Sequence, residues 1–159
     1  MITRTGIGFD CHRLAKRRRL VLGGVEIDYD KGLAGHSDAD VLCHAIMDAL
    51  LGAVGDGDIG VHFPNNDAMW KGARSLDLLK KVVKRLNKKG ARVVNVDSMI
   101  VAEKPKIHSY NKAIRKSIAS AIGVNVNCIS VKATTAEGMG AIGRGEGMAA
   151  MAVATVRVR

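Results

Sequence analysis

Residues 36–48 read HSDADVLCHAIMD, which combines the start of a helix with an unusual density of histidines and acids. Apolar residues recur at helical spacing from this stretch onward and predict a buried helix face. They are Val41, Leu42, Ala45, Ile46, Ala49 and Leu50. Ser37 or Asp38 is expected to cap this helix, because a side-chain oxygen there can accept a bond from a free backbone N–H. We expect the helix to end near Gly52.

A second face of the same helix carries Asp40, His44 and Asp48, which lie four residues apart. A helix that only needs a cap and an apolar face does not require this polar line. We interpret His44 as a metal ligand and the helix start beside His36 as a place that receives an anion. Asp40 or Asp48 could support a ligand imidazole from behind. For Asp48 the alternative is an ordinary solvent-exposed acid.

The N-terminal strand, expected over Ile2–Cys11, brings two further candidate ligands. Residues two apart in a strand face the same side, so Asp10 and His12 converge while Cys11 points away. One carboxylate and two imidazoles suit zinc, and three protein ligands leave one position open for water or substrate. A lone histidine would be better explained as an ordinary hydrogen-bonded residue. The three residues together favour a zinc site formed by Asp10, His12 and His44.

The remaining pattern alternates strands and helices. Strands are expected at Leu20–Leu22 and Val25–Ile27 around a glycine turn, Val93–Ala102, Ile129–Lys132 and Met148–Val158; helices are expected from Ser75, as its cap, to Gly90 and from about Ser109 to Gly123. We expect Asp30–Gly32 to close the hairpin unit and lead into the helix, and residues 133–147, with five glycines, to form no regular element. This order predicts an α/β (α+β) fold, with a mixed four-stranded sheet, helices on one face and a small β-hairpin. Residues 1–159 are expected to form a single domain.

Net charge is +10, with basic clusters at Lys16–Arg19 and Lys80–Lys89, so an RNA-binding module is one hypothesis. Single-strand binders usually stack bases on aromatic side chains, and aromatic residues make up only 3% here. We therefore interpret the basic clusters as solvated surface and expect no nucleic-acid partner. Attraction of a small, highly anionic substrate remains an open alternative.

We expect this chain to be neither exported nor inserted into a membrane. No apolar run is long enough to span a bilayer, and the N-terminal MITRTGIGFD lacks the apolar core of a signal peptide. Three cysteines without paired spacing indicate a reducing compartment. We expect a cytoplasmic protein without a membrane partner.

Two glycine-rich motifs near the C-terminus can bind phosphate. Thr134-Thr135-x-Glu137 follows a strand and offers hydroxyls and a carboxylate, which suit phosphate oxygens and magnesium. A capping box is an equally good explanation of that motif. Arg144, between two glycines, presents a guanidinium that can bind phosphate bidentately, or it is an exposed arginine beside a tight turn.

Two further segments are open to more than one interpretation. Asp58 and Asp67, in a loop rich in Gly and Asn, could bond polyol hydroxyls or simply face solvent. The strand exit Ala102–Ile107, with two lysines, could contact a nucleotide or be a basic turn. No Ser/His/Asp order or reactive-cysteine context is visible. These groups together indicate a metal-dependent enzyme that acts on phosphoryl groups.

Six motifs in this order and spacing resemble one known family. They are GFDCH (8–12), GLAGHSDADVLCHA (32–45), GDIGVHFP (57–64), AEKPKI (102–107), KATTAEGMG (132–140) and GRGEG (143–147). The family is that of 2-C-methyl-D-erythritol 2,4-cyclodiphosphate synthase, in its stand-alone form, and the resemblance covers essentially the whole chain. Two positions depart from the family pattern. Ala141 stands where many members have phenylalanine beside a channel on the trimer axis, and Ala136 replaces a common threonine.

The resemblance implies a homotrimer with active sites between subunits. The reaction it implies is attack of the 2-phosphate of 4-diphosphocytidyl-2-C-methyl-D-erythritol 2-phosphate on its own β-phosphorus, with release of CMP. A metal-dependent phosphohydrolase acting on a nucleotide or sugar phosphate is the alternative, because the same groups could position water.

The resemblance also assigns roles to residues. Asp10, His12 and His44 match the zinc ligands, Glu137 matches the contact to Mg²⁺ (or Mn²⁺), and His36 and Thr135 fall where the transition state is stabilised. Asp48 is expected to support the site. Substrate contacts are expected from Asp10, Cys11, His12, His36 and Ser37; Asp58, Ile59, Gly60, Phe63, Pro64, Asn65, Asn66 and Asp67; Ala102, Glu103, Lys104, Pro105, Lys106, Ile107 and His108; and Thr134, Thr135, Ala136, Glu137 and Arg144.

Overall fold

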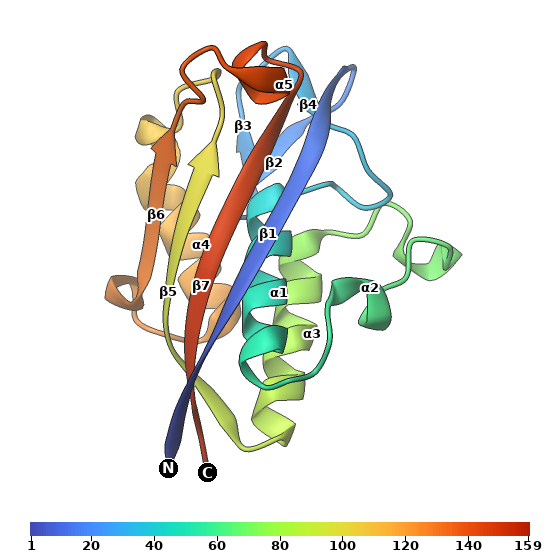
Figure 1. Ribbon diagram of the computed structural model, residues 1–159. Coiled ribbons are helices and arrows are strands. Elements are labelled where there is room, and N and C mark those ends of the chain that lie inside the picture. The colour runs from blue at the N-terminus through green and yellow to red at the C-terminus, as the bar shows by residue number, and fades with distance from the viewer.

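Two long antiparallel strands form the centre of the computed structural model, which describes residues 1–159 (Figure 1). β1 (Ile2–Lys16) pairs with β7 (Gly147–Val158) along almost its whole length. β7 also pairs antiparallel with β5 (Ala91–Val101), and β5 runs parallel to β6 (Ile129–Thr134). With the short β4 (Lys31–Leu33) beside β1, the sheet order is β4-β1-β7-β5-β6. The sheet is mixed, as the sequence predicted.

Three helices cover one face of this sheet: α1 (Val41–Ala53), α3 (Ser75–Lys88) and α4 (Asn111–Ile122) (Figure 1). The hairpin of β2 (Leu20–Leu22) and β3 (Val25–Ile27) is a separate small sheet. The shorter elements are α2 (Ile59–His62), α5 (Gly140–Gly143) and the 3₁₀ turns η1 (Ala68–Trp70), η2 (His108–Tyr110) and η3 (Val126–Cys128). A continuous apolar core lies between sheet and helices. The α+β architecture with a β-hairpin is confirmed. The helices are all too short or too polar to cross a membrane.

Local details differ from the sequence prediction. β4 adds a fifth strand where only a connection to the helix was expected, because three residues at the sheet edge can pair with the end of β1 despite their Lys and Gly. The glycine-rich segment contains one helical turn, α5, so the expectation of no regular element there was wrong. α1 is capped by Asp40, not by Ser37 or Asp38: the Asp40 carboxylate accepts from the Cys43 N–H at 3.0 Å.

Glycines in β1 allow α1 to approach the sheet closely. A Cβ atom on Gly6 would overlap the carbonyl oxygen of Ala49, and one on Gly8 would overlap that of Ala45. Only residues without a side chain fit where two backbones meet this closely. This contact places the N-terminal half of α1 directly over the strand that carries Asp10 and His12.

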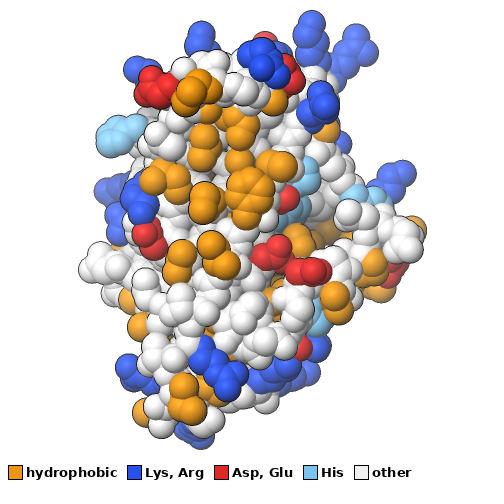
Figure 2. All heavy atoms as spheres, in the orientation of Figure 1, with side chains coloured by type: hydrophobic (Ala, Val, Ile, Leu, Met, Phe, Trp, Pro, Cys, Tyr) orange, Lys and Arg blue, Asp and Glu red, His pale blue; other side chains and the backbone are white.

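The other face of the β1–β7 pair has no helix over it. Cross-strand pairs place Ile7 beside Val153 and Phe9 beside Met151. These four side chains are 43–68% exposed and form an apolar patch near the middle of the face seen in Figure 2. We call these four residues the open sheet face. Contiguous exposed apolar surface of this kind marks an interaction site.

Candidate active site

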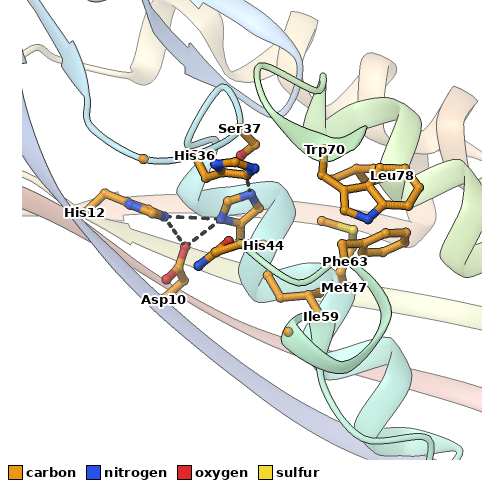
Figure 3. Close-up of a pocket in the computed structure, with 13 residues that line it drawn as sticks. Asp10, His12, His36, Ser37, His44, Met47, Ile59, Phe63, Trp70 and Leu78 are labelled. Carbon is orange, nitrogen blue, oxygen red and sulfur yellow. Dashed lines mark hydrogen bonds and ion pairs between the residues drawn. The ribbon is translucent and has the colours of Figure 1, made fainter. Parts of the chain in front are cut away.

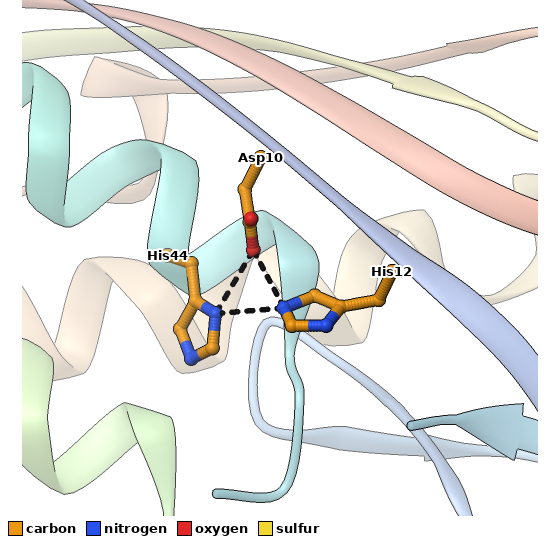
Figure 4. Close-up of side chains that lie close together, drawn as sticks. All are labelled: Asp10, His12 and His44. Atoms are coloured by element: carbon orange, nitrogen blue, oxygen red, sulfur yellow. Dashed lines mark hydrogen bonds and ion pairs between the residues drawn. The ribbon is translucent and has the colours of Figure 1, made fainter. Parts of the chain in front are cut away.

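Asp10, His12 and His44 meet where β1 passes under α1 (Figure 4). Oδ2 of Asp10 lies 2.9 Å from Nε2 of His12 and 2.9 Å from Nδ1 of His44. The two imidazole nitrogens are 3.2 Å apart. The structure therefore brings together all three residues that the sequence predicted as metal ligands, with one atom of each directed at a common point.

Hydrogen bonding on its far side sets the protonation of His12. Nδ1 of His12 lies 2.8 Å from the carbonyl oxygen of Ala34, which can only accept, so Nδ1 carries the proton and donates. In the protonated ring Nε2 donates to the Asp10 carboxylate, and in the neutral ring it presents a lone pair that a metal ion can take up. Burial raises the pKa of Asp10, but hydrogen bonds from His12 and His44 outweigh it and lower the pKa to about 2. The hydrogen bond to Asp10 in turn raises the pKa of His12.

This donor set fits a metal ion. A carboxylate and two imidazoles are ligands that zinc prefers, and tetrahedral ligands at zinc distances lie roughly 3.3 Å apart. The three atoms are 2.9–3.2 Å apart, so a few tenths of an ångström of movement would make room for the ion. His44 is 7% exposed and the Asp10 side chain 24% exposed, which leaves one side of the group open to the pocket beside it.

That pocket has a volume of about 180 Å³ and a mixed lining (Figure 3). Polar groups occupy the end near the metal ligands, and apolar side chains occupy the other. Its lining includes Asp10, His12, Gly35, His36, Ser37, His44, Met47, Ile59, Gly60, Phe63, Asn65, Trp70 and Leu78. Sequence analysis named most of the polar part of this lining. It missed Met47, Trp70 and Leu78, because apolar residues on predicted helices and turns carry no sign of which cavity they face.

His36 lies at the polar end and is held by the loop that follows α2. Its Nε2 donates to the carbonyl oxygen of Asp67 at 3.1 Å. The Asp67 carboxylate accepts from the Met69 N–H and caps η1, and the Asp58 carboxylate caps α2 through the Val61 N–H. Both acids thus shape the loop backbone in this structure.

The carboxylates of Asp40 and Asp48 are used in backbone contacts near the pocket. The fully buried Asp40 accepts from the backbone N–H groups of Gly23 and Gly24 as well as from Cys43, and burial raises its pKa. Asp48 accepts from the Ile59 N–H at 2.8 Å, which ties the α2 loop to α1. Neither carboxylate contacts the ring of His44, so the expectation that one of them orients this imidazole was wrong.

Two serine hydroxyls, and not Asp40 or Asp48, lie within hydrogen-bond distance of the His44 ring. Nε2 of His44 lies 2.9 Å from Oγ of Ser75 and 3.2 Å from Oγ of Ser37. The sequence predicted that the Ser75 side chain caps α3, but it does not. The Asp38 carboxylate does so, by accepting from the Ser75 N–H at 3.0 Å. A serine before a helix looks like a cap in sequence, and its use by a distant histidine leaves no local pattern.

A second group of candidate residues lies at the C-terminal ends of β5 and β6. The Glu103 carboxylate accepts from the N–H groups of Ala136 and Gly138, joining the segment 102–108 to the Thr134–Glu137 turn. Within that turn the Thr135 hydroxyl accepts from the Glu137 N–H at 3.2 Å. Arg144 lies apart from these ends, between α5 and β7, and forms an ion pair with Glu146 at 2.6 Å.

This second group does not line the pocket at Asp10. β6 is three strands from β1 in the sheet, a distance of about 14 Å at ordinary strand spacing. Cys11 also lies outside the pocket, since alternation in β1 turns it toward the side of Phe9 and away from Asp10. The candidate residues are thus divided between two regions of the chain.

An α+β fold with an Asp–His–His group that could hold a cation, beside a partly polar pocket, is the arrangement expected of a metal-dependent enzyme. Residues 3–157 match the YgbB family, and the chain belongs to that family. It is 55% identical over 153 residues to the 2-C-methyl-D-erythritol 2,4-cyclodiphosphate synthase of Desulfosudis oleivorans, with 96% of this chain and 91% of the relative covered.

Solved structures agree. The bifunctional IspDF of Campylobacter jejuni superposes with a TM-score of 0.96 at 40% identity, with 99% of this chain but 43% of that longer chain covered. The CDP complex of IspF from Plasmodium falciparum superposes with a TM-score of 0.86 at 33% identity, with 99% and 97% covered. The phosphohydrolase alternative finds no support among the curated relatives, which are named as synthases.

Proposed function

We propose that this protein is a cyclodiphosphate synthase that converts 4-diphosphocytidyl-2-C-methyl-D-erythritol 2-phosphate to 2-C-methyl-D-erythritol 2,4-cyclodiphosphate and CMP. The observation that carries the proposal is the convergence of Asp10, His12 and His44 on one point at the polar end of the pocket. Membership in the YgbB family supports this choice of reaction. The product belongs to the non-mevalonate route to isoprenoid precursors.

The reaction requires no side-chain nucleophile. An oxygen of the 2-phosphate forms a bond to the β-phosphorus, the bond from that phosphorus to the oxygen bridging to the α-phosphate breaks, and CMP leaves with the bridging oxygen. The protein must place the two phosphoryl groups and neutralise their charge. His36 borders the pocket, where Nδ1 can donate a hydrogen bond when the ring is protonated, because Nε2 is used by the Asp67 carbonyl; Thr135 can offer a hydroxyl donor from the second group. This is phosphorus–oxygen lyase chemistry.

We assign zinc, one ion per subunit, to Asp10, His12 and His44, and Mg²⁺ (or Mn²⁺) to Glu137. Bound metal ions would polarise phosphoryl oxygens and reduce repulsion between the phosphates. Asp10 and His12 are held by the strand and His44 by the helix, so the three ligands are preorganised. Glu137 is exposed at a turn with a φ of +52°, where its carboxylate accepts only a 3.4 Å hydrogen bond from the Thr135 hydroxyl and can reach a ligand.

Substrate contacts are proposed in both regions. The loop residues Asp58–Gly60 and Phe63–Asp67 border the pocket and would hold the methylerythritol phosphate end. Ala102–His108 would hold the cytidine end, with Thr134–Glu137 and Arg144 near the phosphates. A pocket of about 180 Å³ is smaller than the several hundred cubic ångströms usual for such ligands. It therefore accommodates only part of this substrate.

A homotrimer would resolve the separation of the two regions. In a closed ring each pocket at Asp10 could face the segment 102–108 of a neighbouring subunit, so that every site lies between two chains. The open sheet face supplies apolar surface for such contacts. We infer that residues 1–159 act as one domain, because one continuous apolar core links sheet and helices.

The partner of this enzyme is the cytidine diphosphate substrate rather than a nucleic acid or a membrane. Scarce aromatic residues argue against stacking of bases. The three free cysteines suit a reducing compartment, and we propose the cytoplasm.

The test is incubation of the purified protein with the substrate and Mg²⁺, followed by phosphorus NMR. We expect CMP and a cyclic diphosphate in equal amounts. Release of inorganic phosphate without a cyclic product would contradict the proposal and restore the phosphohydrolase hypothesis.

A further inference from the structure

We propose that Ser75 and Asp38 are positioning residues for His44: they fix its tautomer and its ring orientation so that Nδ1 faces the metal. This inference rests on the proposed zinc site. The contacts that carry it lie behind His44, on the side away from Asp10 and His12, and involve a serine that is fully buried.

The direction of the hydrogen bonds follows from chemistry. An ionised Asp38 carboxylate can only accept, and its Oδ1 lies 2.5 Å from Oγ of Ser75. The Ser75 hydroxyl proton is therefore committed to Asp38. Its oxygen lone pair then accepts from Nε2 of His44, 2.9 Å away, so Nε2 carries the proton of the neutral ring. In this neutral ring Nδ1 is unprotonated, with its lone pair directed at the point shared with Asp10 and His12; in the protonated ring Nδ1 donates instead to the Asp10 carboxylate, 2.9 Å away.

Hydrogen bonds hold the backbone and the carboxylate of Asp38 in place, so that the carboxylate stays in position to accept from the Ser75 hydroxyl. The Asp38 N–H donates to the carbonyl oxygen of Ala73 at 3.1 Å, and its Oδ2 accepts from the Ser75 N–H at 3.0 Å. The next residue, Ala39, is fully buried with a φ of +54°, a left-handed conformation that is unfavourable for alanine. That turn sends Asp38 toward α3 while Asp40 caps α1.

Ser37 cannot fully replace the two hydrogen bonds that link His44 to Ser75 and Ser75 to Asp38, which we call the relay. Its hydroxyl oxygen is farther from His44 Nε2, at 3.2 Å, and already accepts from the Ala39 N–H. No acceptor-only group is bonded to the Ser37 hydroxyl, so nothing dictates the direction of its proton. The Ser75–Asp38 pair alone makes Nε2 the donor. Such outer hydrogen bonds usually change metal affinity 10- to 100-fold when they are removed.

The test compares the full chain with Ser75→Ala and Asp38→Asn. Zinc affinity is measured by competition with a chelator, and the His44 tautomer by nitrogen-15 NMR of the metal-free chain at a pH where the ring is neutral. We expect both variants to bind zinc about 10- to 100-fold more weakly. Asp38→Asn should also populate the Nδ1-protonated ring, because an amide N–H facing Ser75 would turn the serine proton toward His44.

Ser98→Ala is the matched control, since Ser98 is also buried and its hydroxyl donates to the carbonyl oxygen of Ser130. It should keep wild-type zinc affinity and the wild-type tautomer. If Ser75→Ala does not fold, Asp38→Asn decides, because it preserves side-chain volume. Unchanged zinc affinity and an unchanged tautomer in the variants would overturn the proposal. Failure of the wild-type chain to bind zinc would instead overturn the zinc site. The His44 tautomer would then still show whether Ser75 and Asp38 keep the proton on Nε2.

Discussion

Gly8 of β1 lies against the carbonyl oxygen of Ala45 in α1, with no room for a Cβ atom between them. Ala45 is the neighbour of His44, and Gly8 is two residues before Asp10. The same contact that packs the helix on the sheet therefore sets the distance between two proposed metal ligands. Fold and site are coupled at this point.

Gly8→Ala should destabilise the protein by about 2 kcal/mol or more, because the overlap is with backbone that cannot rotate away. It should also weaken zinc binding by moving α1. Thermal unfolding and zinc titration would measure both effects. Gly52→Ala is the control. Gly52 lies in α1, the helix that Gly8 contacts, and a Cβ there would be 3.9 Å from its nearest neighbour. It should be neutral or stabilising by about 0.5–1 kcal/mol. Equal stability of the two variants would contradict the packing argument.

Asp10→Asn should alter the pH dependence of stability in the metal-free protein. The pKa of Asp10 is lowered to about 2, so its contribution is present above the unfolded pKa of about 4 and disappears as pH falls toward 2. The pKa of His12 is raised, so its share is present below about 6.5 and fades as pH rises through the raised value. The stability difference between wild type and Asp10→Asn should therefore be largest between about pH 4 and 6.5. Chemical unfolding with a chelator present would check this, and a difference independent of pH would argue against the ion pair.

Phe9→Asp should prevent trimer formation. Phe9 is 57% exposed at the centre of the open sheet face, and a buried carboxylate there would have no partner. Light scattering after size-exclusion chromatography would report the molar mass. Met69→Asp, at an apolar residue 70% exposed in η1 and outside this face, should leave the mass unchanged. A wild-type chain that runs as a monomer would refute the trimer itself.

Active sites shared between subunits predict complementation. His44→Ala disables the pocket of its own chain, and Glu137→Gln disables the second region. Each variant alone should be inactive. Random trimers formed by refolding both chains together should regain about a quarter of wild-type activity, because one interface in four pairs an intact pocket with an intact Glu137. Mixtures as inactive as the separate variants would show that each chain uses its own Glu137.

The sequence predicted the long elements well because their patterns are strong and local. The apolar spacing after Val41 and the β-branched residues from Val93 specify a helix and a strand without help from the rest of the chain. β4 could not be predicted, since Lys31–Leu33 becomes a strand only through pairing with Leu14–Lys16. α5 was missed because its glycines disfavour a helix in isolation.

For the site too, the sequence predicted what depends on local patterns and missed what depends on long-range contacts. Alternation in a strand was enough to align Asp10 with His12, and helical spacing placed His44 on a polar face. The role of Ser75 could not be found this way, because its partner His44 is 31 residues away and meets it only when α1 and α3 pack together. Asp40 misled for a related reason: its distance from His44 along the helix is right, but its carboxylate is used by three backbone N–H groups.

The most direct test of the central claim is to run the reaction in water enriched in oxygen-18 and weigh the products by mass spectrometry. Attack by the internal 2-phosphate makes and breaks bonds only within the substrate, so neither CMP nor the cyclic diphosphate should carry the label. One oxygen-18 atom in either phosphate-containing product would mean that water is the nucleophile, and would contradict the assignment of this pocket to cyclisation.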